Sequence, residues 1–286
     1  MKQKMCNDRI FERAIILSDF DGTFAFSRLG ETPSPQEDNL RAVEYFKQLG
    51  GHFALSTGRL PALLPKIMPF YREVANAPMI MGNGSLLFDP ENGSAIEKHP
   101  IPREKAEMLL DDVLQRFHPK KWYFYGAQGQ ECFPPTAEHR AEPYRFKMNF
   151  IFDDETGAVA FRDYVRERYA SLFNAFRSFP PCCEVVDAAA AKSYLVGSVK
   201  KTVSEKTGIP VSSLRVYVAG DYENDIEIMK ACDMSFCPSN ALDEVKKVAD
   251  HTLCHCSEGI VYPMLEYIEE NERTKPWERN STLQQQ

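Results

Sequence analysis

The sequence predicts an α/β protein with a parallel sheet, interrupted by an inserted domain of mixed α+β structure. Near both ends of the 286-residue chain, short apolar runs alternate with segments of helical periodicity. This alternation is typical of parallel strands joined by right-handed crossovers. Between them, hairpin signals are mixed with separate helices. We expect a core formed by residues 1–83 and 188–270, an inserted domain at 84–187 and a flexible tail at 271–286.

The composition is that of a soluble globular protein with a sizeable core. Hydrophobic residues make up 43% of the chain, charged residues 26%, and the formal net charge is −7. This acidic balance argues against nucleic-acid binding, which needs clustered Lys and Arg. No apolar run reaches the length of a membrane span, and the N-terminus lacks the apolar segment of a signal peptide. We therefore expect a cytoplasmic protein that binds neither nucleic acid nor membranes.

The first predicted strand, an apolar run at residues 14–18, ends in two aspartates, Asp19 and Asp21. Residues i and i+2 of a strand point to the same side, so both carboxylates face one point. They repel each other there unless a cation lies between them, and an oxygen-only ligand set suits Mg2+. Gly22 lets the backbone approach whatever the carboxylates bind. The alternative is a solvated, Asp-rich turn after a buried strand.

The segments that follow continue the α/β pattern. Apolar periodicity and Gly or Pro boundaries predict helix, strand, helix and strand at residues 36–49, 52–55, 60–68 and 79–81. The first of these strands runs into Ser56-Thr57-Gly58-Arg59 and the second into Gly82-Asn83-Gly84. Open α/β sheets bind their ligands at the carboxyl ends of the strands. Both loops are therefore candidates for the binding site.

The inserted segment predicts a hairpin, two helices and three further strands. Their ranges are 86–88 with 95–99 for the hairpin, 104–117 and 158–169 for the helices, and 122–125, 147–152 and 183–186 for the strands. The side chains here whose chemistry suits substrate recognition are Trp122, Tyr123, Tyr125, Tyr144, Arg145 and Lys147. Aromatic residues at alternating strand positions more often belong to a core, and Lys147 is better explained as a solvated lysine on an edge strand.

The parallel pattern resumes after the insertion. It predicts helices at 188–206, 225–231, 240–248 and 259–269, and strands at 215–219, 234–237 and 251–253. The strand at 215–219 ends in Gly220-Asp221-Tyr222-Glu223-Asn224-Asp225. So many acids at one strand end are costly unless they share a cation. If this strand lies beside the first, Asp221 joins Asp19 and Asp21 around one Mg2+. N-capping of the next helix is the alternative for Asn224 and Asp225.

The eight cysteines show no disulfide-scaffold spacing, so reduced thiols are expected. Cys254-His255-Cys256, with His251 just before, raises the alternative of a zinc site. Its two cysteines are only two residues apart, however, and lack a matching distal pair. Packing is the preferred explanation for these residues.

Three of these stretches together resemble motifs I, II and IV of the haloacid dehalogenase (HAD) superfamily. They are Asp19-Phe20-Asp21-Gly22-Thr23, Ser56-Thr57-Gly58-Arg59 and Gly220-Asp221-Tyr222-Glu223-Asn224-Asp225. The resemblance is greatest to the Cof-type phosphatases with a C2B cap. In those proteins a turn leads into the cap, and Gly82-Asn83-Gly84-Ser85 resembles this turn. Ser239-Asn240-Ala241, Val248-Ala249-Asp250 and Glu258-Gly259 resemble their C-terminal segment. The resemblance covers about residues 14–268 and implies a Rossmannoid HAD core with the insertion as its cap.

Motif III departs from the pattern of that superfamily. Its lysine stands shortly after a strand, at the start of a helix, usually in a Gly-x-Ser-Lys-Gly setting. Counted from the strand at 183–186, Lys192 fits this place. Counted back from Gly208, the expected place is Val196, about one helical turn later, and Lys200 lies on the same helix face. We choose Lys192, with Lys200 as the alternative and the start of the helix in question.

The resemblance implies a phosphatase that acts through an aspartyl-phosphate. Asp19 would be the nucleophile and Asp21 the general acid and base. Mg2+ would bind the Asp19 carboxylate, the Asp21 main-chain carbonyl and Asp221, with Asp225 completing the metal site. The phosphoryl oxygens would be held by Thr57, Lys192 and backbone N–H groups near Gly22. Candidates for further substrate contacts are Arg59, Asn83, Asn224 and Lys147, although Arg59 is nearly as well explained by a salt bridge on the helix face.

The implied substrate is a small phosphorylated metabolite. Sugar phosphates and cofactor phosphates such as flavin mononucleotide (FMN) or pyridoxal phosphate are all handled on this fold, and the cap sequence does not choose among them. Two alternatives remain. A phosphotransferase such as a sugar phosphomutase would have a longer, Gly-rich fourth motif. A regulatory HAD-fold binding protein without turnover is kept open by the unusual third motif.

Overall fold

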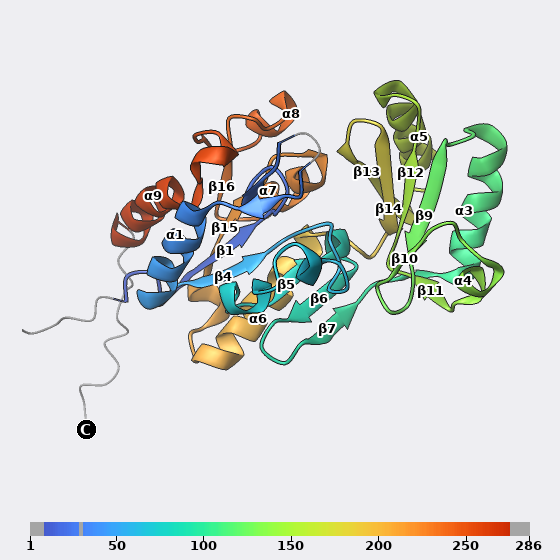
Figure 1. The fold of residues 1–286 in the computed structure, drawn as a ribbon. Coiled ribbons are helices and arrows are strands. Elements are labelled where there is room, and N and C mark those ends of the chain that lie inside the picture. The colour runs from blue at the N-terminus through green and yellow to red at the C-terminus, as the bar shows by residue number, and fades with distance from the viewer. Residues whose placement is uncertain (1–8, 29–30, 275–286) are drawn as a thin grey trace, which may run out of the picture.

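The computed structural model describes residues 9–28 and 31–274, which form a core lobe and a cap lobe (Figure 1). The core contains a parallel five-stranded sheet, as predicted for an α/β fold of this class. Its strands, in spatial order, are β17 (His251–Thr252), β16 (Met234–Cys237), β15 (Arg215–Ala219), β1 (Ala14–Ser18) and β4 (His52–Leu55). The central strand β1 is buried along its whole length, which explains its uninterrupted apolar sequence. Because β1 pairs with β15, the two acidic loops that follow these strands are neighbours.

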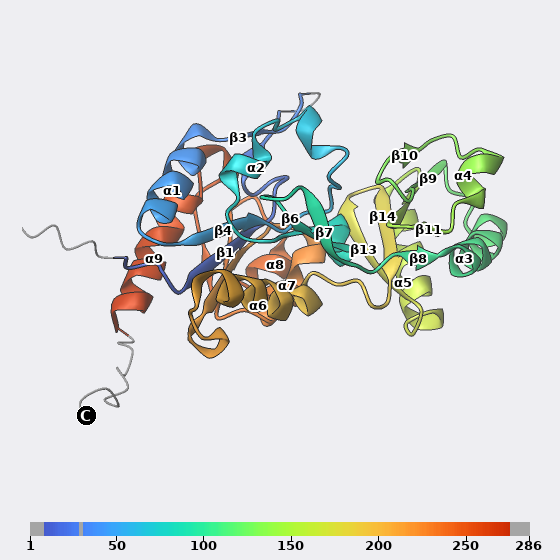
Figure 2. The same cartoon turned by 90° about the horizontal axis from the view of Figure 1, so that it is seen from below.

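Helices cover both faces of this sheet. Helices α1 (Glu37–Gln48) and α9 (Val261–Thr274) lie on one face, and α6 (Val196–Thr207) and α7 (Ile226–Lys230) on the other (Figure 2). The short helix α8 (Asp243–Lys246) follows β16. Helix α9 runs on through residues 271–274, which had been assigned to a tail. The rest of that predicted tail, 275–286, lies outside the described residues.

The predicted helix at residues 60–68 is wrong. This segment contains only a 3-10 turn at Leu64–Lys66, and the short helix α2 (Tyr71–Val74) follows it. The physical reason is proline spacing: Pro65 and Pro69 lack the N–H groups that a continuous helix would need, and their rings clash with the preceding turn. The apolar periodicity here reflects burial of Leu60, Leu64 and Met68 along an irregular segment.

The predicted hairpin exists, but it extends the core sheet. Strands β5 (Met79–Met81), β6 (Leu86–Asp89) and β7 (Ser94–Lys98) form an antiparallel sheet, attached to the main sheet by the parallel bridge between Ser56 and Ile80. The buried side chains of β6 pack in the core cluster. We therefore propose that the inserted domain begins after β7, near residue 99, and not at residue 84.

The cap is an antiparallel five-stranded sheet with helices on one face. In spatial order, its strands are β10 (Glu131–Cys132), β9 (Lys121–Tyr125), β12 (Lys147–Ile151), β14 (Cys182–Asp187) and β13 (Phe173–Phe179). Its remaining elements are β8 (Ile101–Pro102), α3 (Arg103–Arg116), α4 (Ala137–Ala141), β11 (Tyr144–Arg145) and α5 (Glu155–Arg168). The seven-residue strand β13 was not predicted. Its inward positions include the buried Arg177, where an apolar residue would have completed the alternating pattern.

The two faces of the cap sheet differ in chemistry because successive strand residues point to opposite sides. One face, with Phe124, Met148, Phe150, Cys183 and Val185, belongs to a separate hydrophobic cluster under α3 and α5. The other face carries polar and aromatic side chains and looks toward the core lobe. Its members line a cavity between the lobes and are described with the site below.

The two connections between core and cap lie together. The chain enters the cap just before α3 and leaves it at the end of β14, and Lys105 Nζ is 2.9 Å from Asp187 Oδ2 across this junction. Asp187 also accepts a hydrogen bond from the Ala189 N–H, which turns the chain back toward the core. The base of the cap is thus closed by an ion pair.

Two expectations from the sequence concern regions outside the site: membrane-spanning helices and the Cys254-His255-Cys256 segment. None of the helices within residues 9–28 and 31–274 is long and apolar enough to cross a membrane. In the Cys254-His255-Cys256 segment, the Cys254 thiol contacts the Gly259 carbonyl and Cys256 is buried. His251 stacks on Tyr267, with ring centroids 4.1 Å apart. These packing contacts account for residues that had been considered for zinc.

Candidate active site

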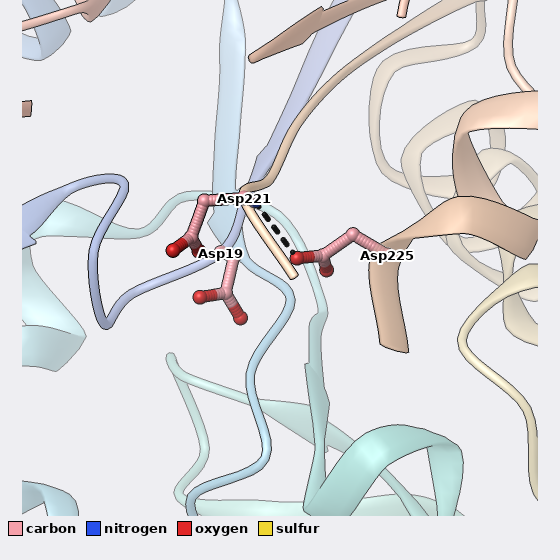
Figure 3. Close-up of side chains that lie close together, drawn as sticks. All are labelled: Asp19, Asp221 and Asp225. Carbon is pink, nitrogen blue, oxygen red and sulfur yellow. Dashed lines mark hydrogen bonds between the residues drawn. The ribbon is translucent and has the colours of Figure 1, made fainter. Parts of the chain in front are cut away.

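Three carboxylates meet at the carboxyl ends of β1 and β15. Asp19 follows β1, Asp221 follows β15 and Asp225 directly precedes α7, and one oxygen from each lies within 4.8 Å of the others (Figure 3). Asp225 Oδ2 accepts the Asp221 N–H at 3.1 Å and the Tyr222 N–H at 3.3 Å. It makes no side-chain capping bond to α7, but its bond from the Tyr222 N–H belongs to a capping box of the 3-10 turn Glu223–Asp225 that leads into α7. Asp225 therefore combines the predicted capping role with its place in the acidic loop. We call these three residues the acidic triad.

Two glycines allow the triad to form. Gly22 has φ +76°, and a Cβ at this position would lie 2.3 Å from Asp221 Oδ2. A Cβ on Gly220 would lie 2.3 Å from the Asp225 carboxyl carbon. Any larger residue would therefore push one carboxylate out of the group. The Gly22 N–H, which had been proposed to bind phosphate, donates to the Ala25 carbonyl within the turn. The close approach to Asp221 is a structural reason for glycine here, and a contact of this backbone with phosphate stays a prediction.

Lys192 is the lysine that contacts the triad. Its Nζ lies 3.0 Å from Asp19 Oδ1 and 2.7 Å from Asp225 Oδ1, and it also donates to the Ser56 carbonyl. Lys200, the alternative, lies on α6. The helix predicted at 188–206 begins later in the structure. Residues 188–192 form the turn out of the cap, and a 3-10 turn from residue 193 leads into α6.

The charges of the site are not balanced by protein groups alone. Burial, together with the neighbouring aspartates, raises the pKa of Asp19, and burial and Asp225 raise the pKa of Asp221 to about 7. Burial alone would lower the pKa of Lys192, but the Asp19 and Asp225 carboxylates raise it. Three ionised carboxylates and one ammonium leave two negative charges. A single divalent cation would neutralise them, and carboxylate oxygens are ligands that Mg2+ prefers.

The Asp21 carboxylate lies outside the triad. Arg59 holds it with two hydrogen bonds of 2.7 Å, Nε to Oδ2 and Nη2 to Oδ1. The salt bridge considered for Arg59 on a helix face is not found, because no helix forms there and Arg59 pairs with Asp21 instead. A contact of Arg59 with substrate stays a prediction. The Arg59 guanidinium also lies 5.7 Å from the centre of the Phe20 ring. This pair fixes the direction of the Asp21 carboxylate at the edge of the site.

Thr57, predicted to bind phosphate, is buried behind this edge. Its Oγ1 accepts the Arg59 N–H at 3.1 Å, and its N–H donates to the Ile80 carbonyl. The Thr57 side chain therefore shapes the turn that delivers Arg59. A contact with phosphate stays a prediction.

A cavity of about 430 Å³ opens between the triad and the cap. From the core it is lined by Asp19, Asp21 and Arg59, and from the cap by Tyr123, Tyr125 and Lys147. Its other lining residues are Gly58, Leu63, Asn83, Asn149, Ser178, Phe179, Glu184, Asp221, Tyr222 and Asn224. The acidic group thus faces a partly open cavity large enough for a small metabolite.

Comparison with known proteins identifies this arrangement. The family model of haloacid dehalogenase-like hydrolases matches residues 16–265. The chain belongs to this family. Its recognition as a HAD-type hydrolase related to the Cof-type phosphatases is therefore confirmed. As a relative, the 5-amino-6-(5-phospho-D-ribitylamino)uracil phosphatase YitU of Bacillus subtilis is 22% identical over 274 residues, which cover 89% of this chain and 97% of the relative.

Solved structures show the same fold. A Streptococcus mutans protein superposes with a TM-score of 0.72 at 14% identity, covering 89% of this chain and 98% of that one. A Bacteroides thetaiotaomicron protein, described among the phosphatases of the haloalkanoate superfamily, gives a TM-score of 0.67 at 19% identity, covering 94% and 98%. At these identities the likeness concerns the fold alone.

In this HAD-like hydrolase, the prediction of Lys147 as a solvated edge lysine is wrong. Strand β12 lies between β9 and β14, so it is not an edge strand. Lys147 is buried and its Nζ lies 2.8 Å from Glu184 Oε2. Of the other predicted cap residues, Tyr123 and Tyr125 line the cavity, as does Lys147.

Three aromatic or basic cap residues have structural roles. Trp122 packs against the hydrophobic cluster of the cap. Arg145 is fully buried and donates to Glu107 and to two backbone carbonyls. The Tyr144 hydroxyl donates to the Ala127 carbonyl. Packing therefore explains these three.

Asn83 and Asn224 connect the core to the cap. Asn224 Nδ2 donates to Asn83 Oδ1 at 3.0 Å, and Asn83 Nδ2 donates to Glu184 Oε2 at 2.7 Å. Asn83 adopts a left-handed conformation, with φ 57°, between two glycines. This conformation is tolerated by asparagine more readily than by most residues. Both predicted substrate-contacting asparagines thus line the cavity while holding its two walls together.

Two groups of residues at this site were missed in the sequence. Asn149, Ser178 and Glu184 line the cavity from the cap. Polar residues alternating with apolar ones along β12 and β14 were the available signal. Glu223, in the acidic loop, accepts the Arg177 N–H at 2.8 Å and pairs with Arg162, which ties the cap to this loop. No local sequence signal joins residues so far apart.

Addition of Mg2+ should stabilise the protein more at pH 8 than at pH 5.5. The pKa of Asp221 is about 7 in the folded protein without metal, against a usual 3.8. Between these two pH values the folded state therefore holds a proton on Asp221 that the unfolded chain has released. This contribution makes the free energy of unfolding fall as pH rises from about 4 to 7. Mg2+ needs the ionised carboxylates, so we expect a rise in Tm of about 5 °C at pH 8 and almost none at pH 5.5.

Thermal unfolding with MgCl2 or EDTA measures this effect. The Asp221→Asn variant serves as the control and should lose the Mg2+-dependent rise at pH 8. An equal rise at both pH values would contradict binding at the triad.

Proposed function

We propose that this protein is a Mg2+-dependent phosphatase that hydrolyses a small phosphorylated metabolite through an aspartyl-phosphate intermediate. The observation that carries the proposal is the acidic triad held by Lys192, opening into a cavity that also contains Asp21. Membership of a hydrolase family supports it. A purely structural acidic cluster would not need to open into a cavity that also contains Asp21.

In the first half of the proposed reaction, an Asp19 carboxylate oxygen attacks phosphorus. The new Asp19–phosphorus bond forms as the bond to the leaving-group oxygen breaks, and Asp21 gives that oxygen a proton. In the second half, Asp21 takes a proton from water, which attacks phosphorus and releases Asp19. Arg59, which donates to both Asp21 oxygens in the structure, would keep the Asp21 side chain directed toward the cavity.

The triad would bind Mg2+ through Asp19 and Asp221, with the Asp21 main-chain carbonyl and Asp225 as the further predicted groups. When bound, the ion supplies positive charge that offsets the approach of an anionic phosphate to anionic carboxylates. Lys192 orients Asp19 through its 3.0 Å contact and contributes a second positive charge beside the phosphoryl group. Thr57 remains the proposed partner of a phosphoryl oxygen.

The cap encloses the substrate. Burial of the cavity between the lobes would exclude bulk water from the phosphorylated aspartate. The expected substrates are sugar phosphates or cofactor phosphates such as FMN and pyridoxal phosphate. The name of the relative YitU adds 5-amino-6-(5-phospho-D-ribitylamino)uracil to the compounds worth testing.

Phosphate release from a panel of these compounds tests the proposal. We expect release by the purified protein with MgCl2, and none with EDTA. The panel should contain p-nitrophenyl phosphate, a generic ester that makes few demands on the cap. Well-folded protein that shows the Mg2+-dependent rise in Tm but releases no phosphate from any ester would instead favour a regulatory binding protein.

A further inference from the structure

One turn of the core lies between the cap and the acidic triad. It is the 3-10 turn Glu223–Asp225, which ends in Asp225 of the triad. The middle residue, Asn224, reaches the cap through Asn83. The first residue, Glu223, contacts the cap directly. Successive side chains of one turn thus belong to the cap contact and to the proposed metal site.

Glu223 is surrounded by arginines of the cap. Its Oε2 accepts the Arg177 N–H at 2.8 Å, and its Oε1 lies 3.4 Å from Arg177 Nε. Arg162 also donates to Oε1, and Arg166 Nη2 lies 3.8 Å from Oε2. The Glu223 side chain is only 5% exposed. A carboxylate buried to this extent is costly without its partners, so the cap arginines determine where Glu223 lies.

Arg177 makes the closest set of contacts across the two lobes. It lies on β13, the edge strand of the cap sheet, and its side chain is buried. Besides Glu223, it pairs with Glu155 of the cap, and its Nη2 is 3.4 Å from Glu244 Oε1 on α8 of the core. Its guanidinium lies 5.8 Å from the centre of the Tyr222 ring. Arg177 therefore joins the cap to two parts of the core, the acidic loop and α8.

The turn transmits the position of Glu223 to the triad. Asp225 Oδ2 accepts the N–H groups of Asp221 and Tyr222, which closes the loop on itself. Asp225 Oδ1 accepts from Lys192. Because Glu223 and Asp225 are two residues apart in this one turn, a displacement of Glu223 also shifts Asp225 and the backbone that it binds.

We propose that Glu223 and Arg177 are positioning residues that couple docking of the cap to binding of Mg2+ at the triad. With the cap docked, the arginines hold the turn where Asp221 and Asp225 can share one ion. Coupling between two sites is reciprocal, so the cap should also dock more firmly when Mg2+ is bound. This inference rests on the proposed function for its metal site, and needs no turnover.

Calorimetric titration of the full-length protein with MgCl2 at pH 8 tests the coupling. Arg177→Met removes a positive charge from the cap, and by charge alone the loss of a nearby cation would strengthen the binding of Mg2+. Positioning predicts the opposite sign. We expect the Kd for Mg2+ to rise about tenfold, a usual size for coupling between two sites.

Two further variants locate the effect. Arg168→Met is the matched control, because Arg168 is an exposed arginine of the same cap that lies over the Tyr169 ring, and it should change the Kd by less than about twofold. Glu223→Gln should weaken Mg2+ binding at least as much as Arg177→Met. The double variant should bind no more weakly than Glu223→Gln alone, since both substitutions remove one shared contact.

Amide hydrogen exchange of the unmodified protein gives an answer that needs no variant. The Arg177 N–H must leave Glu223 before it can exchange, so its rate reports opening of the contact between the lobes. We expect MgCl2 to slow this exchange about tenfold. The amides of α3, which packs on the opposite face of the cap sheet, should keep their rates.

An unchanged or smaller Kd for Mg2+ in Arg177→Met, or exchange at Arg177 that does not respond to MgCl2, would overturn the coupling. Unmodified protein that binds no Mg2+ would refute the proposed metal site together with this inference. Coupled docking and Mg2+ binding, without phosphate release from any ester, would refute only the phosphatase.

Discussion

Replacing Asp19 with asparagine is expected to reduce turnover by roughly 10⁵-fold, because an amide cannot replace the attacking carboxylate. The expected loss is in kcat and not in substrate affinity. Asn retains the size of the side chain and an oxygen within reach of Lys192. The measurement is steady-state phosphate release from the best ester of the panel.

The same substitution should not unfold the protein. Asp19 is buried beside Asp221 and Asp225, and burial already raises its pKa. Removing one of three mutually repelling carboxylates should keep Tm or raise it when no metal is present. Activity of Asp19→Asn above a few per cent of the original would exclude an aspartyl-phosphate on this residue.

Replacing Lys192 with methionine should have the second largest effect, a loss of about 10²–10³-fold in kcat. Lys192 positions Asp19 and joins it to Asp225, and methionine keeps the apolar stem without the ammonium group. Two buried carboxylates would then lose their charged partner. We therefore also expect a lower Tm at pH 8 than at pH 5.5, where protons can partly replace the lysine charge.

Lys200→Met is the matched control, because it removes the same charge from α6. It should change kcat by less than about twofold, as expected for a surface substitution away from the site. If Lys200→Met were the more damaging variant, the third motif would have to be reassigned to α6.

The parallel strands of the core and their acidic loops could be predicted because they depend on local patterns, whereas the pairing of β1 with β15 had been only a condition for the metal site. An apolar run followed by two aspartates specifies both a buried strand and what lies at its end, and β1 ends directly before Asp19 as expected. The Asp21 carboxylate, expected to face the same point as Asp19, instead pairs with Arg59 outside the triad. The neighbouring β15 brings Asp221 to the same point. Parallel topology then requires the loops to meet.

The errors came from features that local periodicity does not report. Prolines at 65 and 69 broke a segment whose apolar spacing was helical. The start of α6 depends on how the chain leaves the cap, which is fixed by hydrogen bonds to Asp187. The polar face of the cap sheet arises when strands distant in sequence align Lys147, Asn149 and Glu184. Only the register of these strands shows that Lys147 and Asn149 both bind the Glu184 carboxylate.

The ion pair between Lys105 and Asp187 has a consequence for how such enzymes change substrates. Because the pair closes the base of the cap, the segment between them is a loop whose ends are already held together. Bringing the ends of a long loop together costs little more as the loop grows, by about 0.6 kcal/mol for each doubling of length. The cap also has its own hydrophobic cluster, separate from that of the core. The cap can therefore change in length at little cost while the hydrolytic core keeps its strand order.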